Sequence, residues 1–156
     1  MTDPGATLRV ERVGASALYD LRRRVLRAGR PEAVVANRAD EDPLARDFAG
    51  YLDGRLVVSA SFFAEDGIFD AGARQLRYMA TDFDVQGRGL GAALLAGAED
   101  VLAREGVRTL WANARDSALG FYRRCGWRVV EGSEHISEET QIPHTVIVKD
   151  IGAARG

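Results

Sequence analysis

The feature that most constrains the fold of this sequence is a glycine-rich turn between a strand pattern and a helix pattern, within Leu76–Glu105. Residues 75–81 alternate as a strand does, with Leu76, Tyr78 and Ala80 on one face. The turn is Gln86–Gly91. The apolar positions that follow it recur at helical spacing and are Leu90, Leu94, Ala98 and Val101. The sequence therefore predicts a strand, a tight turn and a long helix that ends at Gly106.

The turn has the composition of an anion site. Gly87, Gly89 and Gly91 leave its backbone open to close approach. The first amides of the next helix have no partners inside the helix and lie at the positive end of its dipole, so a pyrophosphate fits there. No Gly-Lys-Ser/Thr follows, which excludes a Walker loop. The spacing G-x-G-x-G also differs from the G-x-G-x-x-G of dinucleotide folds.

Two blocks of the sequence match one known pattern when they are read together. Gln86–Gly91 is Q-x-x-G-x-G, and Trp111–Trp127 ends in A-x-x-F-Y-x-x-x-G-W, with Phe121 and Tyr122 at its centre. In this order and separation the blocks resemble the pyrophosphate loop and the downstream helix of the GNAT superfamily of N-acetyltransferases. The departures from the pattern are Thr81 and Phe83 for Val and Pro, Arg115 for a cofactor-fixing Asn, and Trp127 for Phe.

The chain is expected to form one α/β (α+β) domain, residues 1–156, with residues 1–6 and 151–156 as loose tails. The resemblance implies the GNAT fold, a mixed and mostly antiparallel sheet of six to seven strands flanked by helices, in which strands four and five splay apart. Asp53-Gly54 predicts a two-residue hairpin turn. The strands on either side of the long helix are predicted to be parallel. Asp116 or Ser117 is predicted to cap the next helix, and residues 132–141 are predicted as a polar connection in which His135 is given no role.

The region before the hairpin carries two helix predictions and an acidic segment. Residues 15–27 are predicted as a helix with its arginines, Arg22 to Arg24, on a solvated face, and residues 32–37 as a short helix. Asp40, Glu41 and Asp42 then form an acidic loop. Either this loop is simply solvated or it attracts a cationic amine, because the resemblance places the acceptor site in this region.

The resemblance implies that acetyl-CoA binds along the fourth strand and at the turn. The strand groups that face its pantetheine arm are then those of Met79, Ala80 and Thr81. The amides that hold its pyrophosphate are those of Gln86, Gly87, Arg88, Gly89, Leu90 and Gly91. No metal is expected, because two histidines and one cysteine show no ligand spacing.

The implied reaction is direct attack of an amine on a thioester carbonyl. A lysine-like amine has a pKa of ~10.4 and must first lose a proton to a base or a water chain. A backbone amide near Met79 or Thr81 is the implied donor to the oxyanion. Tyr122 stands where the resemblance places a general acid, and it either protonates the leaving thiolate or only packs beside it.

Three further residues are candidates for the acceptor side of the site. Glu65 lies at the end of the third strand. His144 lies in Ile142-Pro143-His144 at the start of the predicted last strand, 142–148, which resembles the closing strand of a bacterial GNAT subgroup. Each is a candidate base and a candidate substrate-binding residue. Arg77, which the alternation places opposite Leu76 and Tyr78, is a third substrate-binding candidate.

Composition excludes other functions. The net charge of −2 gives no argument for nucleic acid, and no apolar run approaches the ~18 residues of a membrane span. The first residues lack the basic and apolar parts of a secretory signal, and the lone Cys125 fits a reducing cytoplasm.

The prediction is therefore a cytoplasmic, acetyl-CoA-dependent N-acetyltransferase that acts on a small amine. A protein N-terminus or lysine is an alternative acceptor. The alternative class is a non-catalytic acyl-CoA-binding sensor or partner module with the same fold. Because dimers are common in the superfamily, a homodimer is one expectation.

Overall fold

The structure is a computed structural model that describes residues 7–30, 34–138 and 140–152. The predicted tail 1–6 and residues 153–156 lie outside the described residues. Ile151 begins the other predicted tail, but its side chain is buried and its amide donates to the Arg108 carbonyl at 2.8 Å. The prediction of a loose tail is therefore wrong at Ile151.

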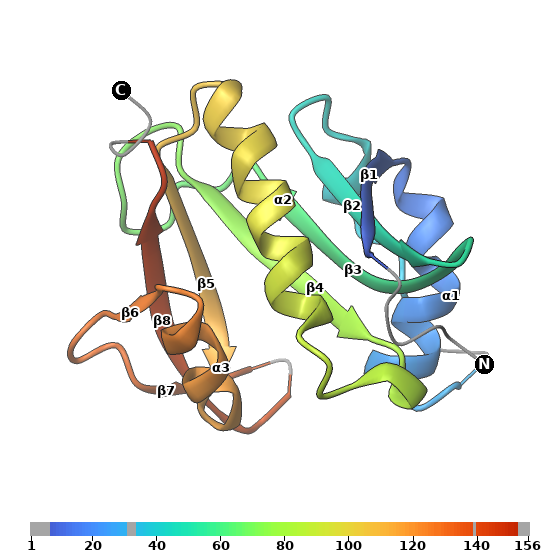
Figure 1. Ribbon diagram of the computed structural model, residues 1–156. Coiled ribbons are helices and arrows are strands. Elements are labelled where there is room, and N and C mark those ends of the chain that lie inside the picture. Colours follow the sequence, from blue (N-terminus) through green and yellow to red (C-terminus); the bar gives the residue numbers. More distant parts are fainter. Residues whose placement is uncertain (1–6, 31–33, 139, 153–156) are drawn as a thin grey trace. The chain divides into compact units, whose positions relative to one another are not determined.

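The strands pair in the order β1-β2-β3-β4-β5-β8-β6, with β7 on β8 (Figure 1). The strand bounds are β1 Arg9–Val13, β2 Arg46–Leu52, β3 Arg55–Phe63, β4 Arg74–Thr81, β5 Thr109–Arg115, β6 Arg128–Val129, β7 His135–Ile136 and β8 Pro143–Asp150. β4 and β5 are parallel at Arg74 and Gln75. The pairings of β1 with β2, β2 with β3, and β8 with β5, β6 and β7 are antiparallel. The predicted mixed, mostly antiparallel sheet is confirmed, with β7 added in a segment that was predicted as a loop.

The helical elements are short except for α2. Their bounds are η1 Ala15–Leu18, α1 Tyr19–Leu21, η2 Arg22–Leu26, η3 Arg38–Glu41, η4 Phe83–Val85, α2 Leu90–Arg104, η5 Asp116–Ala118 and α3 Leu119–Arg124. The predicted helix 15–27 is thus split into 3-10, α and π turns. Within the predicted helix 32–37, residues 34–37 are not helical and residues 32–33 lie outside the described part.

By its contacts the chain divides into two compact units. The first comprises Met1–Phe63 and Arg77–Leu102, and the second comprises Ala64–Leu76 and Ala103–Gly156. In the first unit the predicted hairpin is confirmed, with Asp53 and Gly54 both at positive φ, 49° and 80°.

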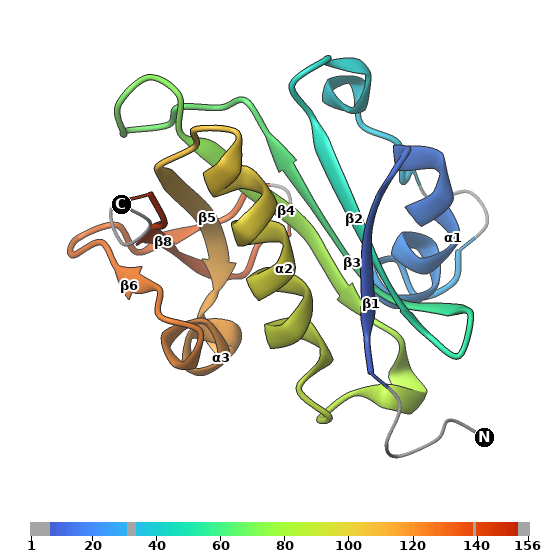
Figure 2. The same ribbon diagram turned by 45° about the horizontal axis from the view of Figure 1, so that its top comes forward.

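Helices cover both faces of the sheet in the first unit. Cross-strand partners share a face, and the partners Asp47 and Ser61 both contact Arg22 of η2. On the opposite face, Val10 of β1 lies so close to Gly97 of α2 that an added Cβ would be 3.1 Å from it. The helical segment α1–η2 therefore packs on one face and α2 on the other (Figures 1 and 2).

In the second unit β5 and β8 form the longest ladder, and α3 follows β5 through η5 (Figure 2). Asp116 or Ser117 was predicted to cap this helix, but no side chain caps η5 or α3. The Asp116 carboxylate instead accepts from the Thr145 hydroxyl at 2.7 Å. The cap prediction is wrong because a partner far along the chain takes the carboxylate.

Candidate active site

The end of β4 and the glycine turn are connected directly in the first unit. The Gln86 side-chain amide donates to the carbonyl of Thr81 at 3.0 Å. A carbonyl oxygen has two lone pairs, so Thr81 keeps one for a ligand. This hydrogen bond therefore links the strand backbone at Met79–Thr81 to the turn at Gln86–Gly91. The resemblance assigned both segments to the same cofactor.

The turn has the shape that a pyrophosphate needs. Gly87 and Gly89 have φ of 79° and 76°, and a Cβ built on either would meet nothing within 4 Å. Residues 86–89 are exposed, whereas Leu90 and Gly91 begin α2 on its buried side. α2 is 15 residues long, so its unpaired first amides carry the full effect of the helix dipole. The residues present fit the cofactor that the sequence implies.

Asp82 holds the turn in place and was missed by the sequence analysis. Its carboxylate accepts two bonds from Arg24 Nη1, at 3.0 and 2.9 Å, and one from the amide of Phe83 at 2.9 Å. Its own amide donates to the carbonyl of Val57 at 2.7 Å. Hydrogen bonds to Asp20 and Asp82 raise the pKa of Arg24. No local spacing predicts this pair, because 58 residues separate the partners.

β4 bends at Tyr78, one residue before the proposed pantetheine segment. Tyr78 has φ of 58°, the left-handed region, which costs a residue other than glycine roughly 1–3 kcal/mol. This bend interrupts the alternation that the sequence predicted. The Arg77 guanidinium lies over the Tyr78 ring, 5.0 Å from its centroid, so the predicted assignment of the two side chains to opposite faces is wrong at this point.

Tyr122 lies in an aromatic cluster of the second unit. Its ring packs edge-on against Phe121 and Trp127, with centroid distances of 5.0 and 5.5 Å. The side chain is 8% exposed, and burial raises its pKa to about 12. Tyr122 therefore keeps its proton throughout the neutral and mildly basic range.

The two base candidates lie in separate surroundings within the second unit. The backbone carbonyl of Glu65 accepts from the Trp111 indole at 2.8 Å, while the residue itself is exposed. His144 is 7% exposed, and its Nδ1 lies 2.9 Å from the carbonyl of Ile142. Its ring lies 6.1 Å from that of His135, which the sequence had left without a role.

The acidic segment does not present three carboxylates to solvent. The side chain of Asp40 is 4% exposed and pairs with Arg22 at 3.2 Å. Arg22 itself is 1% exposed, so the prediction that its guanidinium lies on a solvated face is wrong. A buried ion pair offsets the loss of water only with the help of further hydrogen bonds, and Arg22 also donates to Val35 and Ser61. Glu41 and Asp42 alone remain exposed in this segment.

Known proteins share both the sequence pattern and the fold. The profile of the Acetyltransferase (GNAT) family matches residues 15–127. The chain belongs to the GNAT acetyltransferase family. The chain is 29% identical over 154 residues to "Uncharacterized N-acetyltransferase YitI" of Bacillus subtilis (strain 168). The alignment covers 95% of this chain and 99% of that protein.

Solved structures of GNAT proteins have the same fold. A putative N-acetyltransferase from Lactobacillus plantarum superposes with a TM-score of 0.75 at 20% identity, covering 93% of this chain and 99% of that one. An aminoglycoside 6'-N-acetyltransferase complexed with coenzyme A superposes with a TM-score of 0.70 at 16% identity, covering 92% and 97%.

Membership of the GNAT family makes the protein an acyltransferase that carries out acetyl transfer. Within the described part of the chain, no helix is long and apolar enough to cross a membrane. No three metal-ligating side chains converge among the same described residues.

Proposed function

We propose that this GNAT protein transfers an acetyl group from acetyl-CoA to a small amine. The observation that carries the proposal is the exposed, side-chain-free turn at Gly87 and Gly89 ahead of α2, tied by Gln86 to the carbonyl of Thr81. The solved aminoglycoside 6'-N-acetyltransferase in complex with coenzyme A, which has the same fold, supports the same cofactor. One domain, residues 1–156, is proposed to hold the whole activity.

The cofactor residues are proposed to act through their backbone. The amides of Gln86, Gly87, Arg88, Gly89, Leu90 and Gly91 receive the pyrophosphate, and Arg88 adds an exposed cation to the turn. The backbone of Met79, Ala80 and Thr81 receives the pantetheine arm. Bound acetyl-CoA supplies the thioester, and an amide beside the bend at Tyr78 is proposed to donate to its carbonyl oxygen.

Tyr122 is proposed as the general acid. Its raised pKa keeps the proton that an acid must deliver, and the apolar rings around it exclude water from its phenol. The proton goes to the thiolate of the leaving coenzyme A. A thiolate has a parent pKa near ~8.5, so Tyr122 assists a departure that is already favourable.

The acceptor is proposed to reach the site as an amine that loses a proton to a base or to water. Glu65 and His144 remain the proposed bases, and Arg77 remains a proposed contact for the acceptor. The exposed carboxylates of Glu41 and Asp42 attract cations weakly, because salt screens exposed charges. This attraction favours a small cationic amine as the acceptor. We place the reaction in the cytoplasm, which the single cysteine also favours.

The test is thiol release from acetyl-CoA in the presence of simple amines, amino acids, polyamines, aminoglycosides and short peptides. Release above the background of acetyl-CoA alone with at least one small amine is the expected result. Release with peptides only would reassign the acceptor to a protein. Tight acetyl-CoA binding without release with any acceptor would contradict the proposal and favour a non-catalytic acyl-CoA-binding module.

A further inference from the structure

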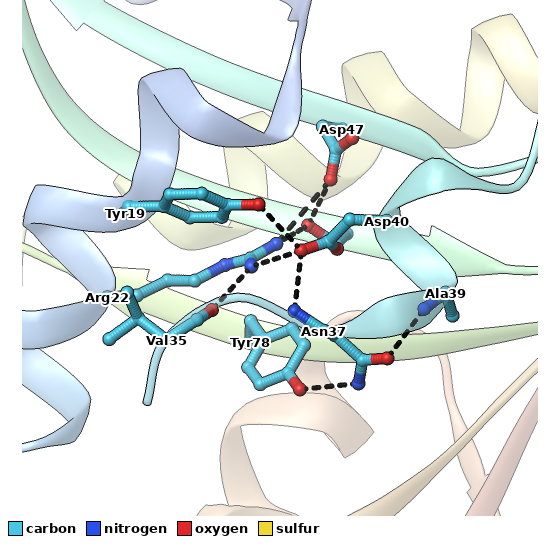
Figure 3. A network of polar contacts seen from close by, with 9 residues as sticks. Tyr19, Arg22, Val35, Asn37, Ala39, Asp40, Asp47 and Tyr78 are labelled. Carbon is cyan, nitrogen blue, oxygen red and sulfur yellow. Dashed lines mark hydrogen bonds and ion pairs between the residues drawn. The ribbon is translucent and has the colours of Figure 1, made fainter. Parts of the chain in front are cut away.

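A buried polar cluster in the first unit joins five segments of the chain around Arg22 (Figure 3). The Arg22 guanidinium donates to the carbonyl of Val35 at 2.9 Å, to Asp40 at 3.2 Å and to the hydroxyl of Ser61 at 2.7 Å. Ser61 in turn donates to Asp47 at 2.6 Å, which also lies 3.5 Å from Arg22. One cation thus ties the segment before η3 to both β2 and β3.

The cluster places two carboxylates beside the Arg22 guanidinium, and Arg12 also acts electrostatically on one of them, Asp47. Arg22 faces two carboxylates whose side chains are 4% and 6% exposed, those of Asp40 and Asp47. Burial raises the pKa of Asp47, although Ser61 and Arg22 oppose the shift. Burial and the hydrogen bond to Asp40 raise the pKa of Tyr19. Apolar residues hold a segment in place at less cost than such a cluster, so stability alone does not account for it.

The cluster ends on Tyr78. The side-chain oxygen of Asn37 accepts a hydrogen bond from the backbone amide of Ala39 at 2.8 Å, which orients the side-chain amide of Asn37. The side-chain nitrogen of Asn37 then donates to the Tyr78 hydroxyl at 2.7 Å (Figure 3). The Arg22 guanidinium lies over the Tyr78 ring, 4.3 Å from its centroid, and Phe63 packs edge-on at 6.1 Å. Ring and hydroxyl of Tyr78 are therefore both held.

The backbone of Tyr78 needs such restraint. At a φ of 58° a tyrosine is strained, and strain of this kind persists only where surrounding contacts over-determine the conformation. The contacts from Asn37, Arg22 and Phe63 converge on this one side chain. The next residue along the chain is Met79, the first of the proposed pantetheine segment.

We propose that Arg22 and Asn37 are positioning residues that hold the bend of β4 at Tyr78, and so set the backbone that receives the acyl group. This inference rests on the proposed function, because it assigns the network a role in that same cofactor site. The network favours acetyl-CoA over free CoA, since only acetyl-CoA carries the acyl carbonyl that the held backbone meets.

Calorimetric binding of acetyl-CoA and of CoA to the full chain tests the proposal. The first two variants are Tyr78→Phe, which removes only the hydroxyl, and Asn37→Ala. The double variant combines these two substitutions. Arg22→Lys keeps the charge and loses the planar fork. Tyr51→Phe is the matched control, since Tyr51 lies on β2 and contacts Arg9 instead. Circular dichroism verifies that each variant is folded.

The readout is the affinity ratio of acetyl-CoA to CoA. We expect Tyr78→Phe and Asn37→Ala each to lower this ratio about threefold to tenfold, the range for one lost hydrogen bond. Arg22→Lys is expected to lower it at least as much, because the Arg22 fork makes three hydrogen bonds. The double variant loses no more than the singles, because Asn37 acts through Tyr78. CoA affinity stays within about twofold of wild type, because the turn is untouched, and Tyr51→Phe changes neither value.

Three results overturn the inference in distinguishable ways. If wild type binds acetyl-CoA more tightly than CoA and the variants keep the ratio while melting earlier, the network is only structural. An equal affinity of wild type for both ligands also rejects it. If wild type binds neither ligand, the proposed function itself fails and the inference fails with it.

Discussion

At the scale of single residues, Tyr122 combines a position that the sequence indicates with an environment that only the structure shows. The A-x-x-F-Y pattern predicts where the phenol stands. The edge-on packing of Phe121 and Trp127 explains why its pKa rises to about 12. At this pKa Tyr122 is protonated at neutral pH, which excludes it as a base. Transfer of its proton to a thiolate with a parent pKa near ~8.5 is uphill, so Tyr122 assists the departure of coenzyme A and does not drive it.

Tyr122→Phe is expected to lower kcat about tenfold to a hundredfold, below the usual range for a general acid because the thiolate leaves readily. Acetyl-CoA affinity stays within about twofold, because the backbone groups that bind the cofactor are unchanged. Steady-state kinetics and calorimetry measure the two quantities. A variant with unchanged kcat would leave Tyr122 with a packing role only.

The pH dependence of the same residue has a definite sign. Because the folded-state pKa is raised from 10.0 to about 12, Tyr122 favours folding below pH 10 and loses that contribution as the pH rises through 12. Ionisation of Tyr122 therefore adds no basic limb to the kcat profile of wild type below about pH 11.

Arg22 marks the limit of sequence reasoning at this scale. Three consecutive arginines on a helix pattern look like a solvated face, and nothing local distinguishes the first of them. The partners that bury Arg22 lie 13, 18 and 39 residues away, at Val35, Asp40 and Ser61. A residue whose contacts are all distant is predictable only once the fold is known.

At the scale of elements, the strand, turn and helix from β4 to α2 were predictable because their determinants are local. Alternation, closely spaced glycines and a helical apolar stripe all lie within Leu76–Glu105. The predictions that failed depend on distant partners. Asp116 does not cap its helix because Thr145 takes its carboxylate, and β7 forms because His135 and Ile136 pair with β8.

Gly89→Val is expected to abolish acetyl-CoA binding, because a side chain would enter the space where the pyrophosphate lies and would also strain a φ of 76°. Gly54→Val is the matched control, since Gly54 has a similar φ of 80° and the same open surroundings, but lies in the β2–β3 hairpin. Calorimetry measures binding, and thermal melting measures the strain. Binding lost equally in both variants would show that strain, and not the turn, is responsible.

At the scale of the whole molecule, the fold class was predictable from two motifs in the right order, and the strand order of the sheet agrees with it. The side-chain network behind β4 was not predictable in the same way. The proposed cofactor site consists of backbone groups at glycines, and closely spaced glycines leave a pattern in the sequence. The network that restrains β4 is built from side chains such as Asn37 and Tyr78, which meet from segments 41 residues apart and leave no pattern in the sequence.

The last prediction concerns the stability of the whole chain. A ligand that binds only the folded state stabilises it by about 2.7 kcal/mol at a concentration 100 times its Kd. For a domain of this length that corresponds to a rise in Tm of about 5–10 °C. Acetyl-CoA and CoA are both expected to raise the Tm of wild type, because both carry the pyrophosphate. Neither is expected to raise that of Gly89→Val, whereas Gly54→Val responds as wild type does. A Tm that rises equally in Gly89→Val would place the pyrophosphate elsewhere than at the turn before α2.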